Sequence, residues 1–274
     1  MNGQYFTSFD GAKIYYHKTE KDKNRWLIFL HGFGGDLTAW KKERAYFSKL
    51  GISSIAMDLR GHGLSERSEK EDFYKLENFA KDVKALIEEE KIKDPVILGH
   101  CFGGMVAIYF QAKFPHQSKA LVLVDTSFKP PFISPHGIPQ VFLKHLFCLL
   151  IKVVPNIKLY GHSDFDQFIG TPDIDLKRLL SDILHTSLKS YLLLCDQLIK
   201  LDSKQLLSKI NVPTLIIEGT EDSIFPPNIA EYLHQRIKKS ELDLIEEANH
   251  ILVLNNPQDL EKSITQFLKK IHFI

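Results

Sequence analysis

The residue of this chain with the clearest capacity for chemistry is a cysteine in a glycine-rich turn. Cys101 stands in GHCFGG (99–104), with Gly99 and Gly103 two residues to either side. An apolar run precedes the turn and a helical pattern follows it, which is the strand–turn–helix context of a nucleophile elbow. In such a turn the glycines let the backbone pass closely, and the start of the helix favours a thiolate. The pattern alone also fits a small buried cysteine. Whether Cys101 is a nucleophile therefore depends on whether the chain also supplies a base and an acid.

A nucleophile of this kind needs a base, and His250 is the histidine whose position suits that role. It lies in EEANHILV, in a loop between a predicted late strand and an apolar segment. A base beside the nucleophile accepts its proton and later returns a proton to the leaving group. His31 and His62 lie within glycine turns and are assigned structural roles. His100 is expected to point away from its neighbour, Cys101.

The base in turn needs a carboxylate to orient it, and two aspartates compete. Asp222 lies in the turn of EGTEDSIFPP, directly after a predicted strand and before His250 in the chain. This gives the order nucleophile, acid, base that is typical of strand–turn–helix nucleophiles. Asp125 ends the apolar run LVLVDT and would approach the same edge of a sheet. The chain order favours Asp222.

Two backbone N–H groups are positioned to stabilise an oxyanion. The first is that of Phe102, the residue after the cysteine, and the second is that of Phe33 in FLHGFGGD. One such donor contributes roughly 100- to 1,000-fold to turnover. Neither the G-x-G-x-x-G spacing nor a following G-K-[ST] is present, which argues against a phosphate-binding loop.

Alternating strands and helices must position these residues. Strands are predicted at 12–20, 25–32, 52–61, 95–100, 120–126, 213–220 and 241–247. Helices are predicted at 43–51, 78–92, 103–114, 227–239 and 257–271. Most of these strands are continuous apolar runs, which indicates a mainly parallel sheet with helices on both faces.

The middle of the chain breaks this alternation. Residues 127–208 contain helical patterns without a convincing strand, so we expect a helical cap inserted into a core made of 1–126 and 209–274. Such a cap would lie over the carboxyl edge of the sheet, where ligands bind in open α/β folds. Its leucine and aromatic residues either line an apolar substrate pocket or pack the cap helices together. Cys148 and Cys195 are interpreted as buried packing residues.

Composition excludes several classes of protein. The 274 residues carry 35 Lys and Arg against 34 Asp and Glu, so nothing favours nucleic acid as a partner. Three widely spaced cysteines predict neither a disulfide framework nor a metal site and favour a reducing compartment. No signal peptide or membrane span is expected, because the most apolar stretch, 141–155, is short and interrupted by charges. We expect a cytoplasmic monomer or homodimer with a small-molecule substrate and no cofactor.

With these pieces in order, the chain resembles the α/β-hydrolase fold family over essentially its whole length. The matching motifs are HGFGG (31–35), DLRGHGLS (58–65), GHCFGG (99–104), GTEDSIFPP (219–227) and NH (249–250). The resemblance implies an eight-stranded, mostly parallel sheet with a cap inserted after the sixth strand. It also implies a catalytic triad and an oxyanion hole, formed by Cys101, Asp222 and His250 and by Phe33 and Phe102. DLRGHGLS is similar to a structural loop of the family, so Asp58, Arg60 and His62 receive no catalytic role.

Cys101 departs from the family, most members of which carry serine, and it makes the chemistry of the aspartate members, the epoxide hydrolases and dehalogenases, an unlikely fit. We expect a carboxylesterase that acts on small to medium acyl esters through an acyl-thioester. Sulfur displaces the tetrahedral oxygen from donors placed for serine, and a misplacement of about 1 Å costs roughly 100-fold, so turnover is expected to be slow. Acyl transfer, thioester hydrolysis and a weakly catalytic binding protein remain as alternatives. A cysteine introduced in place of serine would give the same sequence.

Overall fold

The computed structural model describes residues 3–130, 150, 153–157 and 161–274. Its centre is one eight-stranded sheet in the order β1-β2-β4-β3-β5-β6-β7-β8. The strands are β1 (Gly3–Thr7), β2 (Lys13–Thr19), β3 (Trp26–Leu30), β4 (Ser53–Met57), β5 (Val96–His100), β6 (Ala120–Val124), β7 (Thr214–Gly219) and β8 (Ser240–Ile245).

Only β2 runs against its neighbours. It pairs antiparallel with β1 and β4, whereas every pairing from β4 through β3 to β8 is parallel. All residues of β3, β4, β6 and β7 are buried, which explains their continuous apolar runs. The sequence pattern misses β1, because Phe6 is the one buried residue of this edge strand.

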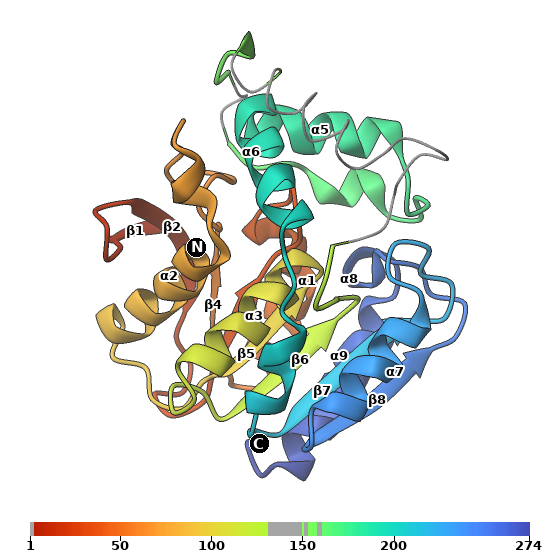
Figure 1. Cartoon of the computed structure of the whole chain (residues 1–274). Coiled ribbons are helices and arrows are strands. Elements are labelled where there is room, and N and C mark those ends of the chain that lie inside the picture. Colours follow the sequence, from red (N-terminus) through yellow and green to blue (C-terminus); the bar gives the residue numbers. More distant parts are fainter. Residues whose placement is uncertain (1–2, 131–149, 151–152, 158–160) are drawn as a thin grey trace.

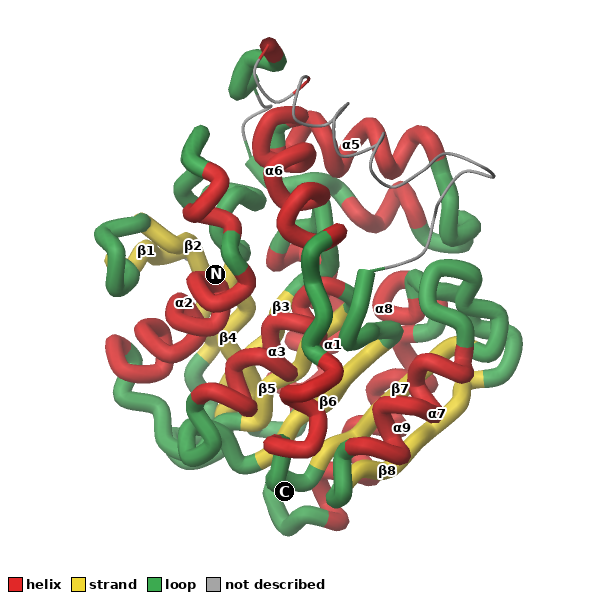
Figure 2. Tube along the Cα trace, viewed as in Figure 1, coloured by secondary structure: helices red, strands yellow, loops and turns green. Residues whose placement is uncertain are grey.

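Helices cover both faces of the sheet (Figures 1 and 2). They are α1 (Lys41–Lys49), α2 (Leu76–Glu89), α3 (Phe102–Lys113), α5 (Leu176–Thr186), α6 (Leu188–Ile199), α7 (Pro227–Arg236), α8 (Leu252–Asn255) and α9 (Pro257–Lys270). One hydrophobic core joins one sheet face to α2, α3 and α7, and a second joins the other face to α1, α8 and α9. The predicted α/β-hydrolase fold class is therefore confirmed.

Helices α5 and α6 lie beyond the upper edge of the sheet (Figure 1). They are the longest helices that the structure describes within 127–208, and the described residues of this segment form no strand. Cys148 lies outside the described residues, and so does most of the apolar stretch 141–155. The division of the chain into core and cap stays a prediction.

Among the described residues, no helix has the length and the apolar character that crossing a bilayer requires.

The parallel strands bring the predicted site residues to one edge. Phe33 follows β3, Cys101 follows β5, Asp222 follows β7 and His250 follows β8. Because the carboxyl ends of parallel strands meet on one side of a sheet, segments distant in sequence converge there.

Candidate active site

Cys101 occupies a strained turn between β5 and α3. Its backbone has φ 50° and ψ −114°, a region that L-residues with a side chain rarely adopt. The turn is held by a hydrogen bond from the Cys101 N–H to the Val124 carbonyl at 3.0 Å. The Thr126 hydroxyl donates to the Cys101 carbonyl at 2.6 Å. The side chain itself is only partly buried, so it remains open to a reactant.

The glycines beside Cys101 are required by backbone contacts, as the sequence predicts. A β-carbon on Gly99 would lie 2.4 Å from the Gly103 carbonyl oxygen. A β-carbon on Gly103 would lie 2.3 Å from the carbonyl oxygen of Leu30 at the end of β3. These distances are far below van der Waals contact, so α3 can approach the sheet this closely only without those side chains.

His250 and Asp222 form a direct hydrogen bond. Nδ1 of His250 lies 2.7 Å from Oδ2 of Asp222, and both side chains are buried. The second carboxylate oxygen, Oδ1, accepts from the N–H groups of Ile224 and Phe225, both at 2.7 Å. Since Nδ1 donates to Asp222, the opposite nitrogen, Nε2, remains to accept a proton.

The electrostatics favour charge separation at this pair. Burial lowers the pKa of His250, but the charge of Cys101 and the hydrogen bonds from Asp222 and Cys101 outweigh it and hold that pKa well above its ordinary value. Burial raises the pKa of Asp222, yet the hydrogen bond and charge of His250 bring it below its ordinary value. The protonated imidazole of His250 is thus stabilised beside the Asp222 carboxylate.

The loop after β3 brings a second N–H group to the elbow. A β-carbon on Gly32 would lie 3.3 Å from the β-carbon of Cys101, which places the Gly32–Phe33 peptide beside the sulfur-bearing residue. Gly34 has φ 75°, and its N–H donates to Nε2 of His62 at 3.2 Å. Within the described residues, neither the N–H of Phe33 nor that of Phe102 takes part in a hydrogen bond, so both are available to an oxyanion.

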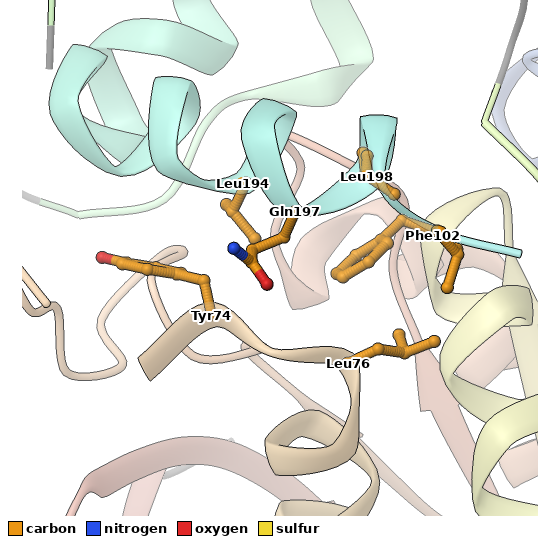
Figure 3. Close-up of a pocket in the computed structure, with 7 residues that line it drawn as sticks. Tyr74, Leu76, Phe102, Leu194, Gln197 and Leu198 are labelled. Carbon is orange, nitrogen blue, oxygen red and sulfur yellow. The ribbon is translucent and has the colours of Figure 1, made fainter. Parts of the chain in front are cut away.

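The ring of Phe102 extends away from the elbow and lines a pocket beneath α6 (Figure 3). Leu194, Gln197 and Leu198 come to this pocket from α6, and Leu76 comes from the start of α2. The residue that follows Cys101 therefore also packs α6 against the core.

The remaining predicted histidines serve the backbone. His31 donates through Nδ1 to the Gly32 carbonyl at 2.8 Å and accepts the Leu59 N–H through Nε2 at 2.9 Å. His100 donates through Nε2 to the carbonyl of His250 at 2.9 Å, so its ring supports the base from behind. Burial and the nearby His250 lower the pKa of His100 to about 3, which keeps that ring neutral.

The loop DLRGHGLS also contacts backbone groups. Asp58 accepts from the N–H groups of Leu37 at 2.9 Å and Leu64 at 2.8 Å, and it bonds His162 at 2.8 Å. Its oxygens, together with those of Asp36 and a nitrogen of His162, lie within 4.8 Å of one another in an arrangement that a metal would fit. These atoms already serve hydrogen bonds, which accounts for the cluster without an ion.

Asp125, the competing acid, lies on the far side of the pair. It is fully buried at the end of β6 and accepts from the N–H groups of Gly219 at 3.1 Å and Leu252 at 3.4 Å. Its carboxylate joins two others, those of Asp222 and Glu218, and an oxygen of each lies within 4.8 Å of the rest. Glu218 is absent from the sequence prediction, although a charged residue in the buried run TLIIEG is a detectable signal.

Two residues from the helical segment also reach the site and are absent from the prediction. The ring of Tyr191 packs on that of Phe33, with 4.4 Å between centroids. Asp182 lies close to Gly34: a β-carbon added to Gly34 would be 2.8 Å from the β-carbon of Asp182. Burial raises the pKa of Asp182 to about 8, despite the nearby Arg178. The helical segment 127–208 therefore brings polar side chains, as well as leucines, to the loop that carries Phe33.

Comparisons with known proteins identify the family and the fold of this chain. The family described as serine aminopeptidase, S33, matches residues 21–258. Among curated proteins, the chain is 24% identical to human Protein ABHD8 over 249 residues, 88% of this chain and 54% of that protein, so it spans about half the length of this relative. It is 30% identical to the pimeloyl-[acyl-carrier protein] methyl ester esterase of Neisseria meningitidis over 222 residues, covering 79% of this chain and 68% of that enzyme.

Solved structures share the fold. An esterase from Thermogutta terrifontis superposes with a TM-score of 0.79 at 22% identity, over 99% of this chain and 100% of that one. The enol-lactonase from Burkholderia xenovorans LB400 superposes with a TM-score of 0.78 at 21% identity, over 97% of this chain and 100% of that one. With the family match across most of its length, the chain belongs to the serine aminopeptidase S33 family of α/β hydrolases.

Proposed function

We propose that this protein hydrolyses carboxylic esters of small to medium acyl chains, with Cys101 as nucleophile, His250 as base and Asp222 as the acid that orients it. The observation that carries the proposal is the short His250–Asp222 hydrogen bond beside a partly exposed cysteine in a strained elbow. A buried structural cysteine would need neither the strain nor the charged partner.

Acylation follows from this geometry. Nε2 of His250 takes the thiol proton, and the sulfur of Cys101 adds to the ester carbonyl carbon. The carbonyl oxygen becomes an oxyanion that the N–H groups of Phe33 and Phe102 stabilise. When the carbon–oxygen bond to the alcohol breaks, the imidazolium gives its proton to the departing oxygen, which leaves a thioester on Cys101.

Deacylation uses the same groups in the same order. His250 removes a proton from water, and the resulting hydroxide adds to the thioester carbonyl in the same oxyanion hole. Collapse of this intermediate expels the thiolate of Cys101, which takes back a proton or remains paired with the imidazolium, and releases the carboxylic acid. An alcohol or thiol in place of water would give acyl transfer through the same intermediate.

We also propose that residues 127–208 form a cap over this edge. Three contacts support it: Tyr191 against Phe33, Asp182 against Gly34, and a hydrogen bond from the Thr186 hydroxyl to the Gly34 carbonyl at 3.2 Å. Each joins the helical segment to the loop that carries Phe33. Exclusion of water above the site would strengthen the oxyanion contacts.

Esters are favoured over peptides although the family takes its description from an aminopeptidase. The amine of an amide is a poorer leaving group than an alcohol, and the tetrahedral intermediate formed from an amide would expel the Cys101 thiolate more readily than the amine. Relatives with esterase and enol-lactonase names support the same preference.

The test is a panel of nitrophenyl acetate, butyrate and octanoate, an aminoacyl nitroanilide, and intact-mass detection of an acylated protein. Ester turnover is expected, with an acyl adduct that is absent from Cys101→Ala and an activity there reduced roughly 10⁴- to 10⁶-fold. Cys195→Ala is the matched control, because burial raises the pKa of Cys195 to about 12 and leaves it unreactive.

Three results would contradict the proposal. Turnover that survives Cys101→Ala would place the nucleophile elsewhere, and turnover of the nitroanilide alone would replace an esterase by a peptidase. Absence of both turnover and adduct across the panel would favour a binding protein. Product analysis with added alcohol separates hydrolysis from acyl transfer.

A further inference from the structure

Glu218 is a buried carboxyl for which the proposed mechanism has no use. It is the penultimate residue of β7, and its side chain is 0% exposed. Among the residues that the structure describes, no hydrogen-bond donor reaches either of its oxygens. The polar atoms closest to it in the cluster are oxygens of Asp125 and Asp222, all within 4.8 Å of one another. A carboxylate surrounded by carboxylates in the core is strongly unfavourable.

The titratable groups around Glu218 come from four strand ends. Asp125 follows β6, Asp222 follows β7, and the imidazolium of His250 follows β8. His100, at the end of β5, contributes no charge, because its pKa is about 3. Three carboxyl groups therefore share one cation, and at least one of them must hold a proton.

The hydrogen bonds indicate which carboxyl is neutral. Asp222 accepts from His250 and from two backbone N–H groups, and Asp125 accepts from the N–H groups of Gly219 and Leu252. Glu218 accepts none within the described residues. Burial, followed by the charges of Asp125 and Asp222, raises the pKa of Glu218 far above its ordinary value.

We propose that Glu218 is a positioning residue: a neutral carboxylic acid that donates a hydrogen bond to the Asp222 carboxylate and so limits the basicity of the Asp222–His250 pair. The proposal rests on the proposed function, since it assigns Glu218 a task only through His250. In this arrangement the Asp222 carboxylate accepts from two donors, the imidazole of His250 and the carboxylic acid of Glu218.

Two substitutions distinguish a neutral Glu218 from an anionic one by the direction in which they move the pH–rate profile. Glu218→Gln keeps a neutral donor, and the limb of the pH–rate profile that reports His250 is expected to stay in place. Glu218→Met removes the donor, concentrates negative charge on Asp222 and moves that limb upward by on the order of one pH unit. If Glu218 were instead an anion, Glu218→Gln would remove a negative charge and move the limb downward.

Glu43 supplies a matched control. It is also fully buried, with no donor to either oxygen among the described residues, but it belongs to α1 beneath the other sheet face. Glu43→Gln and Glu43→Met are expected to change stability and to leave the limb of His250 unmoved. If the Glu43 variants moved the limb of His250 as the Glu218 variants do, the effect at Glu218 would be a general consequence of replacing a buried carboxyl group.

A spectroscopic measurement tests the proton without requiring activity. Infrared spectra of protein labelled with ¹³C-glutamate should contain, at neutral pH, the carbonyl stretch of a protonated acid that disappears in Glu218→Gln. Absence of that band, or a limb that moves downward in Glu218→Gln, would overturn the proposal. So would activity that a chelator abolishes and a divalent cation restores, because a cation would then occupy the cluster. Failure of ester turnover with the band present would reject the proposed function alone.

Discussion

Two buried ionic clusters of this protein are built on opposite principles. In the first, the guanidinium of Arg60, 0% exposed, donates to Asp82 through Nε at 2.7 Å and through a terminal nitrogen at 2.6 Å. Its other terminal nitrogen reaches Asp10 at 2.9 Å. The ring of Phe73 covers the same guanidinium at 4.5 Å. Every donor direction of Arg60 has a partner, and the cluster joins the β1–β2 turn to α2.

The second cluster, at the carboxyl edge of the sheet, has an excess of acids. Asp125, Glu218 and Asp222 share the single imidazolium of His250. Arg60 and Asp82 are as buried as Asp125, Glu218 and Asp222, so burial alone does not distinguish the two clusters. The balance of charge distinguishes them: Arg60 is paired with two carboxylates by direct hydrogen bonds, whereas three carboxyl groups face His250.

The largest effect is expected from removing the charge next to the base. Asp222→Asn deprives the His250 imidazolium of its partner and favours the wrong tautomer, so kcat/KM for a nitrophenyl ester should fall roughly 10⁴-fold with the fold unchanged. Asp125→Asn is the paired control and should change kcat/KM by less than about tenfold, since its amide oxygen still accepts from Gly219. A greater loss in the Asp125 variant would reverse the assignment of the acid.

The Arg60 cluster should respond in stability rather than in rate. Arg60→Met leaves the Asp82 carboxylate buried without a cation, and the free energy of unfolding should fall by about 3–5 kcal/mol. Urea denaturation measures it, with kcat/KM per folded molecule nearly unchanged. Lys41→Met, which removes an exposed ion pair to Asp166, should leave the denaturation midpoint almost where it was. Equal losses in the two variants would contradict the role of burial.

At any single pH step, the smallest change concerns a buried acid outside both clusters. Burial raises the pKa of Glu43 from 4.5 to about 8. The folded state thus keeps a proton that the unfolded chain releases, so this stabilisation is complete below pH 4.5 and is lost as pH rises toward about 8. Glu43→Gln should remove a slope of up to about 1.4 kcal/mol per pH unit from the stability curve in that window. If the difference in unfolding free energy between Glu43→Gln and wild type did not vary with pH in this window, the pKa of Glu43 would not be raised by burial.

The comparison also explains what sequence could predict. Cys101, Gly99 and Gly103 are adjacent in the chain, and the close contacts that require the glycines follow from the strand–turn–helix pattern itself. Asp222 and His250 are predictable for a different reason, because each lies in the loop after a strand and parallel strands end at the same edge.

The sequence pattern does not predict residues whose role depends on contacts between elements that are distant in the chain. Glu218 is one letter in an apolar run, and nothing local to it reveals that Asp125 and Asp222 share its space. Asp182 and Tyr191 come from a helical segment whose placement against Phe33 is set by tertiary contacts, not by helical periodicity. The expectation for His100 was incomplete for the same reason, since its partner is the backbone carbonyl of His250, 150 positions later.

The backbone contacts at Gly99 and Gly103 have a consequence for how such a site can change over evolutionary time. The turn is fixed by main chain packed on main chain, so its shape does not depend on which side chain it presents at position 101. A single-codon exchange between serine and cysteine there alters the reacting atom and leaves its supports in place. The side chain at position 101 is therefore among the easiest properties of this scaffold to vary, and the position of the turn that presents it among the hardest.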